Sequence, residues 1–215
     1  MSLVLQNLAL TLNGKALIKP FSLAVAPSEI VTLMGPSGCG KSSLLSAISG
    51  GLAGAFSQSG TVTINGRDIS RLPPAKRRIG RLFQDDLLFP HLSVGENLLF
   101  GMPRGPRDQR IAKMRAALLE IELEGSETRS PQTLSGGQRQ RVALMRSLLA
   151  EPEAMLLDEP FSKLDDILRA AMRDLTFTKL IATATPTLLV THDKSDAPRK
   201  GRIFKIENAE VISVR

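Results

Sequence analysis

The chain has 215 residues, of which 42% are hydrophobic, and a formal net charge of +7; this suits one compact domain carrying an insertion better than two independent domains. Its longest uncharged apolar stretches, such as residues 187–191, fall far short of the roughly 20 residues that span a bilayer, and residues 1–12 mix in too many polar side chains for a signal peptide. Cys39 is the only cysteine and can form no internal disulfide, in keeping with a reducing cytoplasm.

The N-terminal third is predicted to be mostly β structure. Its apolar or alternating runs are separated by the turn sequences Asn13-Gly14, Pro27-Ser28 and Asn65-Gly66. The predicted strands are residues 3–12, 21–25, 30–34 and 61–64. The third of these strands leads directly into a glycine-rich loop.

That loop, residues 35–42, has the sequence GPSGCGKS and matches the phosphate-binding pattern G-x-x-x-x-G-K-[ST]. Gly38 and Gly40 allow backbone angles that other residues avoid, so successive N–H groups can turn toward phosphates. Lys41 can reach the β and γ phosphates, and the Ser42 hydroxyl is a hard oxygen ligand that suits Mg²⁺. The predicted helix from about Lys41 to Ile48 adds its positive end and stops at Gly50-Gly51.

The alternative is a chance match in a glycine-rich turn. A strand before the loop and a helix after it are the context that phosphate binding requires, and both are predicted here. The loop therefore predicts a nucleoside triphosphate site, in which Cys39 is a small filler.

Basic residues cluster after the first predicted strands, and two kinds of partner fit them. The cluster contains Arg71, Lys76, Arg77, Arg78 and Arg81. One interpretation is nucleic-acid binding, and the other is a surface that faces anionic lipid headgroups or an acidic protein. The chain has no Trp, no Tyr and eight Phe, whereas single-strand binders usually interleave stacking aromatics with basic residues. We favour the second interpretation.

The middle region, from about residue 85 to 133, is predicted to be mostly helical. Ser93 and Glu96 form a capping-box pattern before the apolar residues 97–100. Residues 110–123 carry apolar side chains at helical spacing, between the polar loops 101–109 and 124–133. Helices and strands then alternate again, which indicates a largely parallel α/β sheet.

Two further segments carry candidate chemistry. Asp158 and Glu159 follow the apolar run 155–157, where the first carboxylate could hold Mg²⁺ and the second could accept a proton from an attacking water. Because Pro160 follows, the pair could instead be an exposed helix start. Residues 134–138, with the sequence LSGGQ, combine an S-x-x-Q cap with two glycines whose N–H groups attract an anion; a plain helix cap is the alternative.

With the phosphate loop, LSGGQ and the Asp-Glu pair in this order, the chain resembles the ABC ATPase family, the nucleotide-binding subunits of ABC transporters, over nearly its whole length. The resemblance implies an α/β fold: a P-loop NTPase (RecA-like) core with an N-terminal antiparallel β subdomain and an inserted helical subdomain. The core and β subdomain would occupy residues 1–84 and 151–215, and the helical subdomain with the LSGGQ signature about 85–150.

Further residues of this chain match individual positions of the family's motifs. Gln84 matches the glutamine that touches Mg²⁺ and the attacking water, with a polar strand terminus as the alternative. His192 matches the histidine that contacts the γ phosphate, although a lone histidine at a strand end is often structural. Residues 162–165, SKLD, match the D-loop, usually S-A-L-D, so Lys163 is a departure. His91 lies where importer subunits face the permease, and a plain surface role fits it equally well.

The expected site residues fall into three groups. The catalytic residues are Gln84, Glu159 and His192. The Mg²⁺ ligands are Ser42, Gln84 and Asp158. The ATP-binding residues are Gly35, Pro36, Ser37, Gly38, Cys39, Gly40, Lys41, Ser42, Ser43, Ser135, Gly136, Gly137 and Gln138.

The resemblance implies an ATPase whose two subunits enclose two ATP molecules between the phosphate loop of one and the signature motif of the other. The expected partners are a second copy or a paralogous ATPase subunit, an integral-membrane permease and, through it, a substrate-binding protein, with no specific nucleic acid. The chain would be a peripheral importer subunit at the cytoplasmic face of the inner (plasma) membrane. The competing expectation is a soluble ABC ATPase that acts on ribosomes or DNA.

Leu12 occupies the position where family members usually stack an aromatic residue on adenine.

Overall fold

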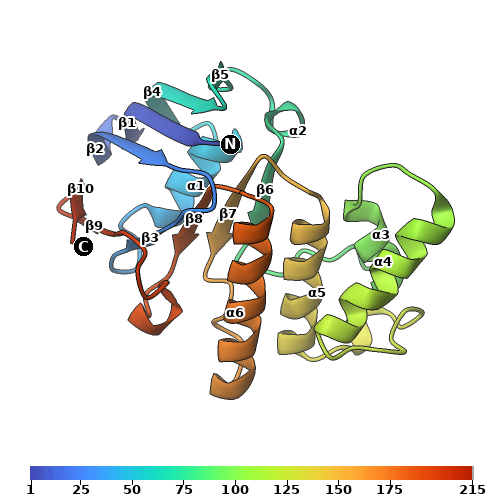
Figure 1. The fold of residues 1–215 in the computed structure, drawn as a ribbon. Coiled ribbons are helices and arrows are strands. Elements are labelled where there is room, and N and C mark those ends of the chain that lie inside the picture. Colours follow the sequence, from blue (N-terminus) through green and yellow to red (C-terminus); the bar gives the residue numbers. More distant parts are fainter. Residues whose placement is uncertain (215) are drawn as a thin grey trace. The chain divides into compact units, whose positions relative to one another are not determined.

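The computed structural model describes residues 1–214, which form two compact units (Figure 1). The first unit contains Met1–Arg81, Glu153–Glu159 and the described residues from Leu180 onward. The second contains Leu82–Pro152 and Pro160–Lys179. The helical subdomain expected at about 85–150 thus lies within the second unit, which also includes residues 160–179 that the sequence-based division assigns to the core.

The first unit begins with an antiparallel sheet of strand order β2-β1-β4-β5. The strands are β1 (Leu3–Leu12), β2 (Lys15–Val25), β4 (Phe56–Ile64) and β5 (Arg67–Asp68). Asn13 and Gly14 both adopt positive φ, which suits a tight hairpin between β1 and β2. β2 starts before the expected Phe21 because it pairs along β1, and as an edge strand it tolerates Pro20.

A second sheet of order β10-β9-β3-β8-β7-β6 belongs to this unit, except for Leu82 at the end of β6. Its strands are β3 (Ile30–Met34), β6 (Ile79–Leu82), β7 (Ala154–Asp158), β8 (Thr187–Val190), β9 (Ile203–Glu207) and β10 (Glu210–Ser213). β8 pairs in parallel with both β3 and β7, and all three strands are buried throughout. Leu33 and Asp158 both pair with Val190, so the carboxyl ends of the three strands meet at one edge.

Helix α1 (Lys41–Ser49) buries one side in the core of the first unit. Its buried apolar residues are Leu44, Leu45, Ala47 and Ile48. They belong to a single cluster with side chains from both sheets, including Leu10 and Val31. This packing fixes the helix start directly after the phosphate loop.

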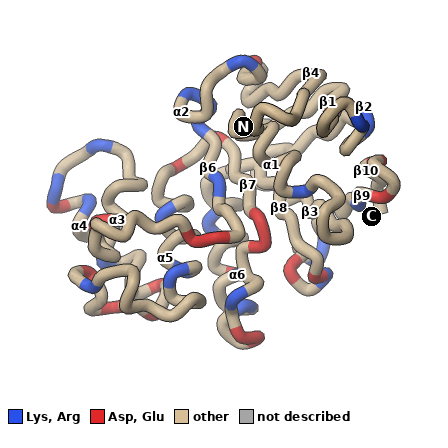
Figure 2. The backbone as a smooth tube through the Cα atoms, turned by 180° about the vertical axis from the view of Figure 1, so that it is seen from behind, with Lys and Arg blue, Asp and Glu red and all other residues tan. Residues whose placement is uncertain are grey.

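The basic cluster expected from the sequence needs one correction. Lys and Arg gather around the short helix α2 (Pro74–Arg77) (Figure 2). Arg77, however, is only 4% exposed, and its guanidinium donates to the carbonyl oxygens of Ala47 and Ile48 at 3.0 and 2.7 Å. It therefore caps the end of α1, where a cation meets unpaired helix carbonyls, and is no part of an exposed surface.

The second unit consists of helices α3 (Val94–Gly101), α4 (Arg107–Glu120), α5 (Gly136–Leu149) and most of α6 (Asp166–Ala182) (Figure 1). The predicted capping box at Ser93 and Glu96 starts α3. α4 begins at Arg107, three residues before the expected position. Asn97 is fully buried, and its side-chain amide donates to the carbonyl oxygens of Phe89, Leu92 and Ser93. These hydrogen bonds fix the loop that precedes α3.

Within residues 1–214, no helix combines the length and apolar character needed to cross a membrane.

Candidate functional site

The phosphate loop lies between β3 and α1 with a preformed, glycine-dependent backbone. Gly38 and Gly40 have φ of +80° and +102°, in the left-handed region that favours glycine. A Cβ atom at Gly40 would also lie only 3.0 Å from Cγ of Leu17, on β2. The backbone shape predicted from the sequence is therefore present, and Gly40 directly precedes the first turn of α1.

Lys41 is held against the loop that precedes it. The residue is 9% exposed, and its Nζ donates to the carbonyl oxygens of Gly35 and Pro36 at 2.7 and 2.8 Å. The ammonium group is therefore already desolvated and surrounded by the loop backbone. Phosphate oxygens are acceptors that could replace these carbonyl partners.

Asp158 ends β7 as a buried carboxylate, 4% exposed, and not as the exposed helix start considered above. Burial raises the pKa of Asp158, while a hydrogen bond from Ser42 and the charges of Arg81 and Lys41 act in the opposite direction. The neighbouring charge of Glu159 acts with burial. Two hard oxygen groups, the Ser42 hydroxyl and the Asp158 carboxylate, are thus brought together beside Lys41.

Glu159 and His192 form a close pair at the same sheet edge. Nδ1 of His192 lies 3.0 Å from Oε1 of Glu159. Glu159 has φ of +48°, and its N–H donates to the carbonyl of Val190 at 2.9 Å, so β8 fixes its backbone. The Glu159 side chain is 19% exposed and that of His192 is 64% exposed. A partly buried carboxylate therefore faces an accessible imidazole.

The loop after β8 is braced by Asp196, which the sequence analysis does not single out. The hydroxyl of Thr191 donates to Oδ2 of Asp196 at 2.6 Å, and the N–H of Asp193 donates to the same hydroxyl at 3.1 Å. Thr191 and Asp196 are both buried. Because Thr191 and Asp196 lie on either side of His192 in the sequence, their hydrogen bond fixes the backbone that carries His192. An acidic residue four positions after a histidine is no signal by itself, because its burial depends on the fold.

The LSGGQ segment starts α5 in the second unit. Ser135 Oγ accepts from the N–H of Gln138 at 3.2 Å, and Gln138 Oε1 accepts from the N–H of Ser135 at 2.9 Å. The predicted S-x-x-Q capping box is therefore formed. Both side chains are occupied by the cap, while Gly136 and Gly137 begin the helix, where backbone N–H groups lack intrahelical partners.

Gln84 is exposed in the second unit, and the residues after it are tied to the signature and D-loop segments. Arg139 Nε donates to Asp86 at 2.9 Å, and Arg139 Nη1 donates to the carbonyl of Leu134 at 2.7 Å. The N–H of Lys163 donates to Oε1 of Gln140 at 3.1 Å, and its ammonium lies 3.8 Å from Asp85. Lys163, which departs from the usual D-loop sequence, thus links the D-loop to Asp85, the residue after Gln84.

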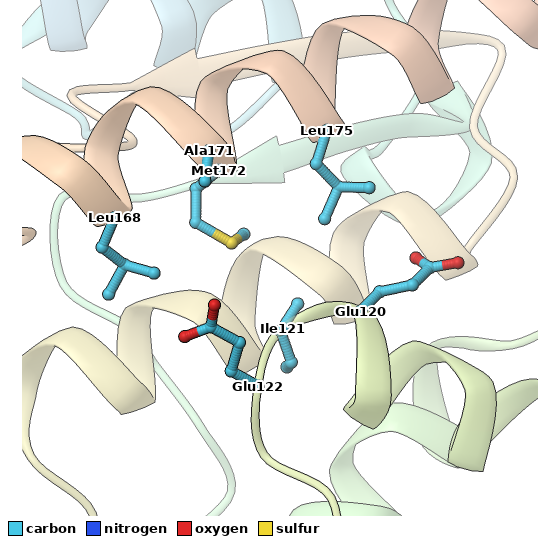
Figure 3. A pocket seen from close by; sticks show the side chains of 7 residues that line it. All are labelled: Glu120, Ile121, Glu122, Leu168, Ala171, Met172 and Leu175. Atoms are coloured by element: carbon cyan, nitrogen blue, oxygen red, sulfur yellow. The ribbon is translucent and has the colours of Figure 1, made fainter.

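The second unit also contains a small pocket between the end of α4 and α6 (Figure 3). Ile121, Met172 and Leu175 give it an apolar floor, while Glu120 and Glu122 stand at its rim. Both glutamates have basic partners: Glu120 pairs with Lys179 at 2.8 Å and Glu122 with Arg141 at 3.4 Å. None of the expected site residues lines this pocket, and we assign it no ligand.

The site combines a loop shaped by glycines, a desolvated lysine, a buried carboxylate beside a serine hydroxyl, and a glutamate paired with a histidine. Together these features define a phosphate-loop nucleotide-binding protein. The family model described as ABC transporter matches residues 18–162. The chain belongs to the ABC transporter family.

Relatives and a solved structure agree with this assignment. The chain is 48% identical over 203 residues to an uncharacterized ABC transporter ATP-binding protein, YnjD, of Escherichia coli (strain K12), covering 94% of each chain. It is 43% identical to the thiamine import ATP-binding protein ThiQ of Jannaschia sp. (strain CCS1), covering 88% of this chain and 83% of that one. It is 41% identical to the sn-glycerol-3-phosphate import ATP-binding protein UgpC of Paracoccus denitrificans, covering 91% of this chain but 55% of that protein.

The solved structure is the dimeric post-hydrolysis state of the ATP-binding cassette MJ0796 bound to ADP and Pi. It shares 31% identity with this chain at a TM-score of 0.84, covering 97% of this chain and 96% of that one. The expected fold class, family and function as an ATPase subunit are confirmed by these likenesses. The alternative of a soluble ATPase acting on ribosomes or DNA is not favoured.

Proposed function

We propose that this chain hydrolyses Mg²⁺-bound ATP with Glu159 as the general base and His192 as the residue that orients it. The observation that carries the proposal is the 3.0 Å contact between His192 Nδ1 and Glu159 Oε1, directly after the buried Asp158. A carboxylate held in this way can accept a proton from a water that attacks the γ phosphate. His192 is exposed enough to reach the phosphate itself.

The residues present fit a magnesium ion. The Ser42 hydroxyl and the Asp158 carboxylate are hard oxygen donors, which Mg²⁺ prefers, and a few protein ligands suffice when phosphates and water supply the others. Within residues 1–214, no group of three or more His, Cys, Asp or Glu is arranged to hold a metal by itself. The bound ion would neutralise charge on the phosphates. Gln84 is a proposed third ligand on the resemblance alone.

A second copy of the chain would complete the site. The family relative in the dimeric state bound to ADP and Pi supports assembly in pairs. The free N–H groups at the start of α5 are suited to an anion, so Ser135, Gly136, Gly137 and Gln138 would contact the ATP held by the other subunit. A paralogous subunit could take the same place.

The membrane partner would be a permease, at the cytoplasmic face of the inner membrane, and the direction of transport would be import. Relatives named as import ATP-binding proteins for thiamine and sn-glycerol-3-phosphate support the direction. An aromatic surface supports the contact. Phe100 is 65% exposed, and the centre of its ring lies 4.6 Å from that of Phe89. The ring centres of Phe89 and His91 are 5.9 Å apart. A substrate-binding protein would act through the permease, and we expect no specific nucleic-acid partner.

The substitution Glu159→Gln tests the proposed chemistry. It keeps the shape of the side chain and removes its basicity, so ATP turnover should fall roughly 100-fold or more while ATP binding persists. Phosphate release should be measured with the permease present, and ATP binding by titration. Glu207→Gln, an exposed carboxylate of the same unit, is the matched control and should retain normal turnover. Near-normal turnover by Glu159→Gln would remove Glu159 from the role of base.

A further inference from the structure

Arg81 is a partly buried cation beside the phosphate site, with no role in the function proposed above. It lies on β6, the strand next to β7. Its Nη1 donates to the Ser49 hydroxyl at 3.0 Å, and its Nη2 donates to the carbonyl oxygen of Ser42 at 3.3 Å. It therefore connects β6 to the first turn of α1, at the residue whose hydroxyl would bind Mg²⁺.

The charge of Arg81 acts on the other proposed ligand. Burial lowers the pKa of Arg81, and the charge of Asp158 acts in the opposite direction. Lys41, on α1, also acts on Asp158. Two fixed cations from separate elements, β6 and α1, thus act on one buried carboxylate. In a partly buried site, such charges interact more strongly than they would in water.

We propose that Arg81 is a positioning residue that holds the backbone of Ser42 and supplies a fixed positive charge beside the phosphate loop. The inference rests on the nucleotide site proposed above. A fixed cation stabilises nucleotide phosphates in the absence of metal and opposes the binding of a second cation nearby. Arg81 therefore reduces the dependence of nucleotide binding on Mg²⁺.

The test compares ADP binding in Mg²⁺ and in EDTA by calorimetry, since ADP cannot undergo γ-phosphate hydrolysis. The quantity measured is the ratio of the two dissociation constants, EDTA over Mg²⁺. Arg81→Gln keeps an amide donor but loses the charge, and it should raise this ratio roughly five- to tenfold, mainly through weaker binding in EDTA. Arg81→Lys keeps the charge and should restore the ratio to near the wild-type value.

Arg78→Gln is the matched control, because Arg78 is 70% exposed and pairs with Glu153; its ratio should not change. Equal weakening of ADP binding by Arg81→Gln in both conditions would indicate a purely structural role and overturn the proposal. If Arg81→Gln does not fold, Arg81→Met provides the neutral variant, and failure of both to fold while Arg81→Lys folds would also overturn it. A wild-type chain that binds no ADP would instead contradict the proposed nucleotide site.

Discussion

Leu12, at the end of β1, lies beside an aromatic residue that is distant in sequence. The register of β1 and β4 pairs Leu12 with Phe56, and both side chains are partly buried. Leu17, on the neighbouring strand, approaches Gly40 of the phosphate loop. This end of the sheet therefore borders the loop, but the residue expected to stack on adenine is aliphatic. Phe56 could not be connected with Leu12 from sequence, because strand pairing alone brings them together.

We predict weak recognition of the base by the natural chain, with poor discrimination of ATP from GTP. Leu12→Tyr should bind ATP roughly tenfold more tightly, since one stacking aromatic contributes about 1–3 kcal/mol. Nucleotide titration checks this, with Leu12→Met as a control for size. Strong ATP preference in the natural chain, together with a large loss of affinity in Phe56→Ala, would show that Phe56 holds the base and contradict the prediction.

The end of α1 depends on one buried arginine, Arg77. Besides the carbonyls of α1, Arg77 donates to those of Ser70 and Leu72, both at 2.8 Å. Gly50, which follows the helix with φ of +83°, leaves room for it, because a Cβ atom there would lie 2.5 Å from Arg77 Nε. The helix end, the glycine and the arginine thus form one structural feature that also stabilises the helix carrying Lys41.

Arg77→Ala should lower the free energy of unfolding by roughly 3 kcal/mol or more, because it leaves several buried carbonyl groups without donors. Urea unfolding of the nucleotide-free protein measures this. Arg78→Ala is the natural comparison: its exposed ion pair with Glu153 should contribute no more than about 1 kcal/mol. Equal effects of the two substitutions would contradict the capping role of Arg77.

The sequence predicts the parts of this molecule that depend on local chemistry. The phosphate loop, the capping boxes at Ser93 and Ser135 and the buried strand before Asp158 are each encoded by a few adjacent residues. The sequence alone does not separate Arg77 and Arg81 from the exposed arginines, because their burial depends on α1, which is distant in sequence. Asp196 and Phe56 were missed for the same reason. The roles of the site residues in catalysis stay predictions.

The exposed aromatic surface of the second unit, formed around Phe89 and Phe100, should connect the ATPase to its permease. Large exposed apolar side chains mark interaction sites when they occur together. Leu87 is 54% exposed, and its carbonyl oxygen accepts from Arg146 at 3.0 Å. The guanidinium of Arg146 lies 5.3 Å from the centre of the Phe89 ring, which stacks edge-on with Phe100. In the proposed function, contact with the membrane partner is the one role that requires these side chains to be exposed.

Phe100→Asp should leave the ATPase activity of the free protein within about twofold and abolish its stimulation by the permease, because a charge replaces a large contact in a desolvated interface. ATPase assays with and without the permease in vesicles distinguish the two effects. Leu119→Asp, on α4, replaces a side chain that is similarly exposed, at 60%, and should retain stimulation. Loss of stimulation in both variants would argue against a specific surface.

If two copies of this chain build each ATP site together, mixing two inactive variants should restore activity. Lys41→Ala removes the phosphate-binding cation, and Ser135→Arg places a bulky cation at the start of α5, so each variant alone should be inactive. A heterodimer of the two retains one site with an intact phosphate loop from one chain and an intact signature from the other. We predict that mixing the inactive variants recovers ATPase activity. Mixed dimers that are confirmed by mass and remain inactive would show that the two chains do not share the ATP site.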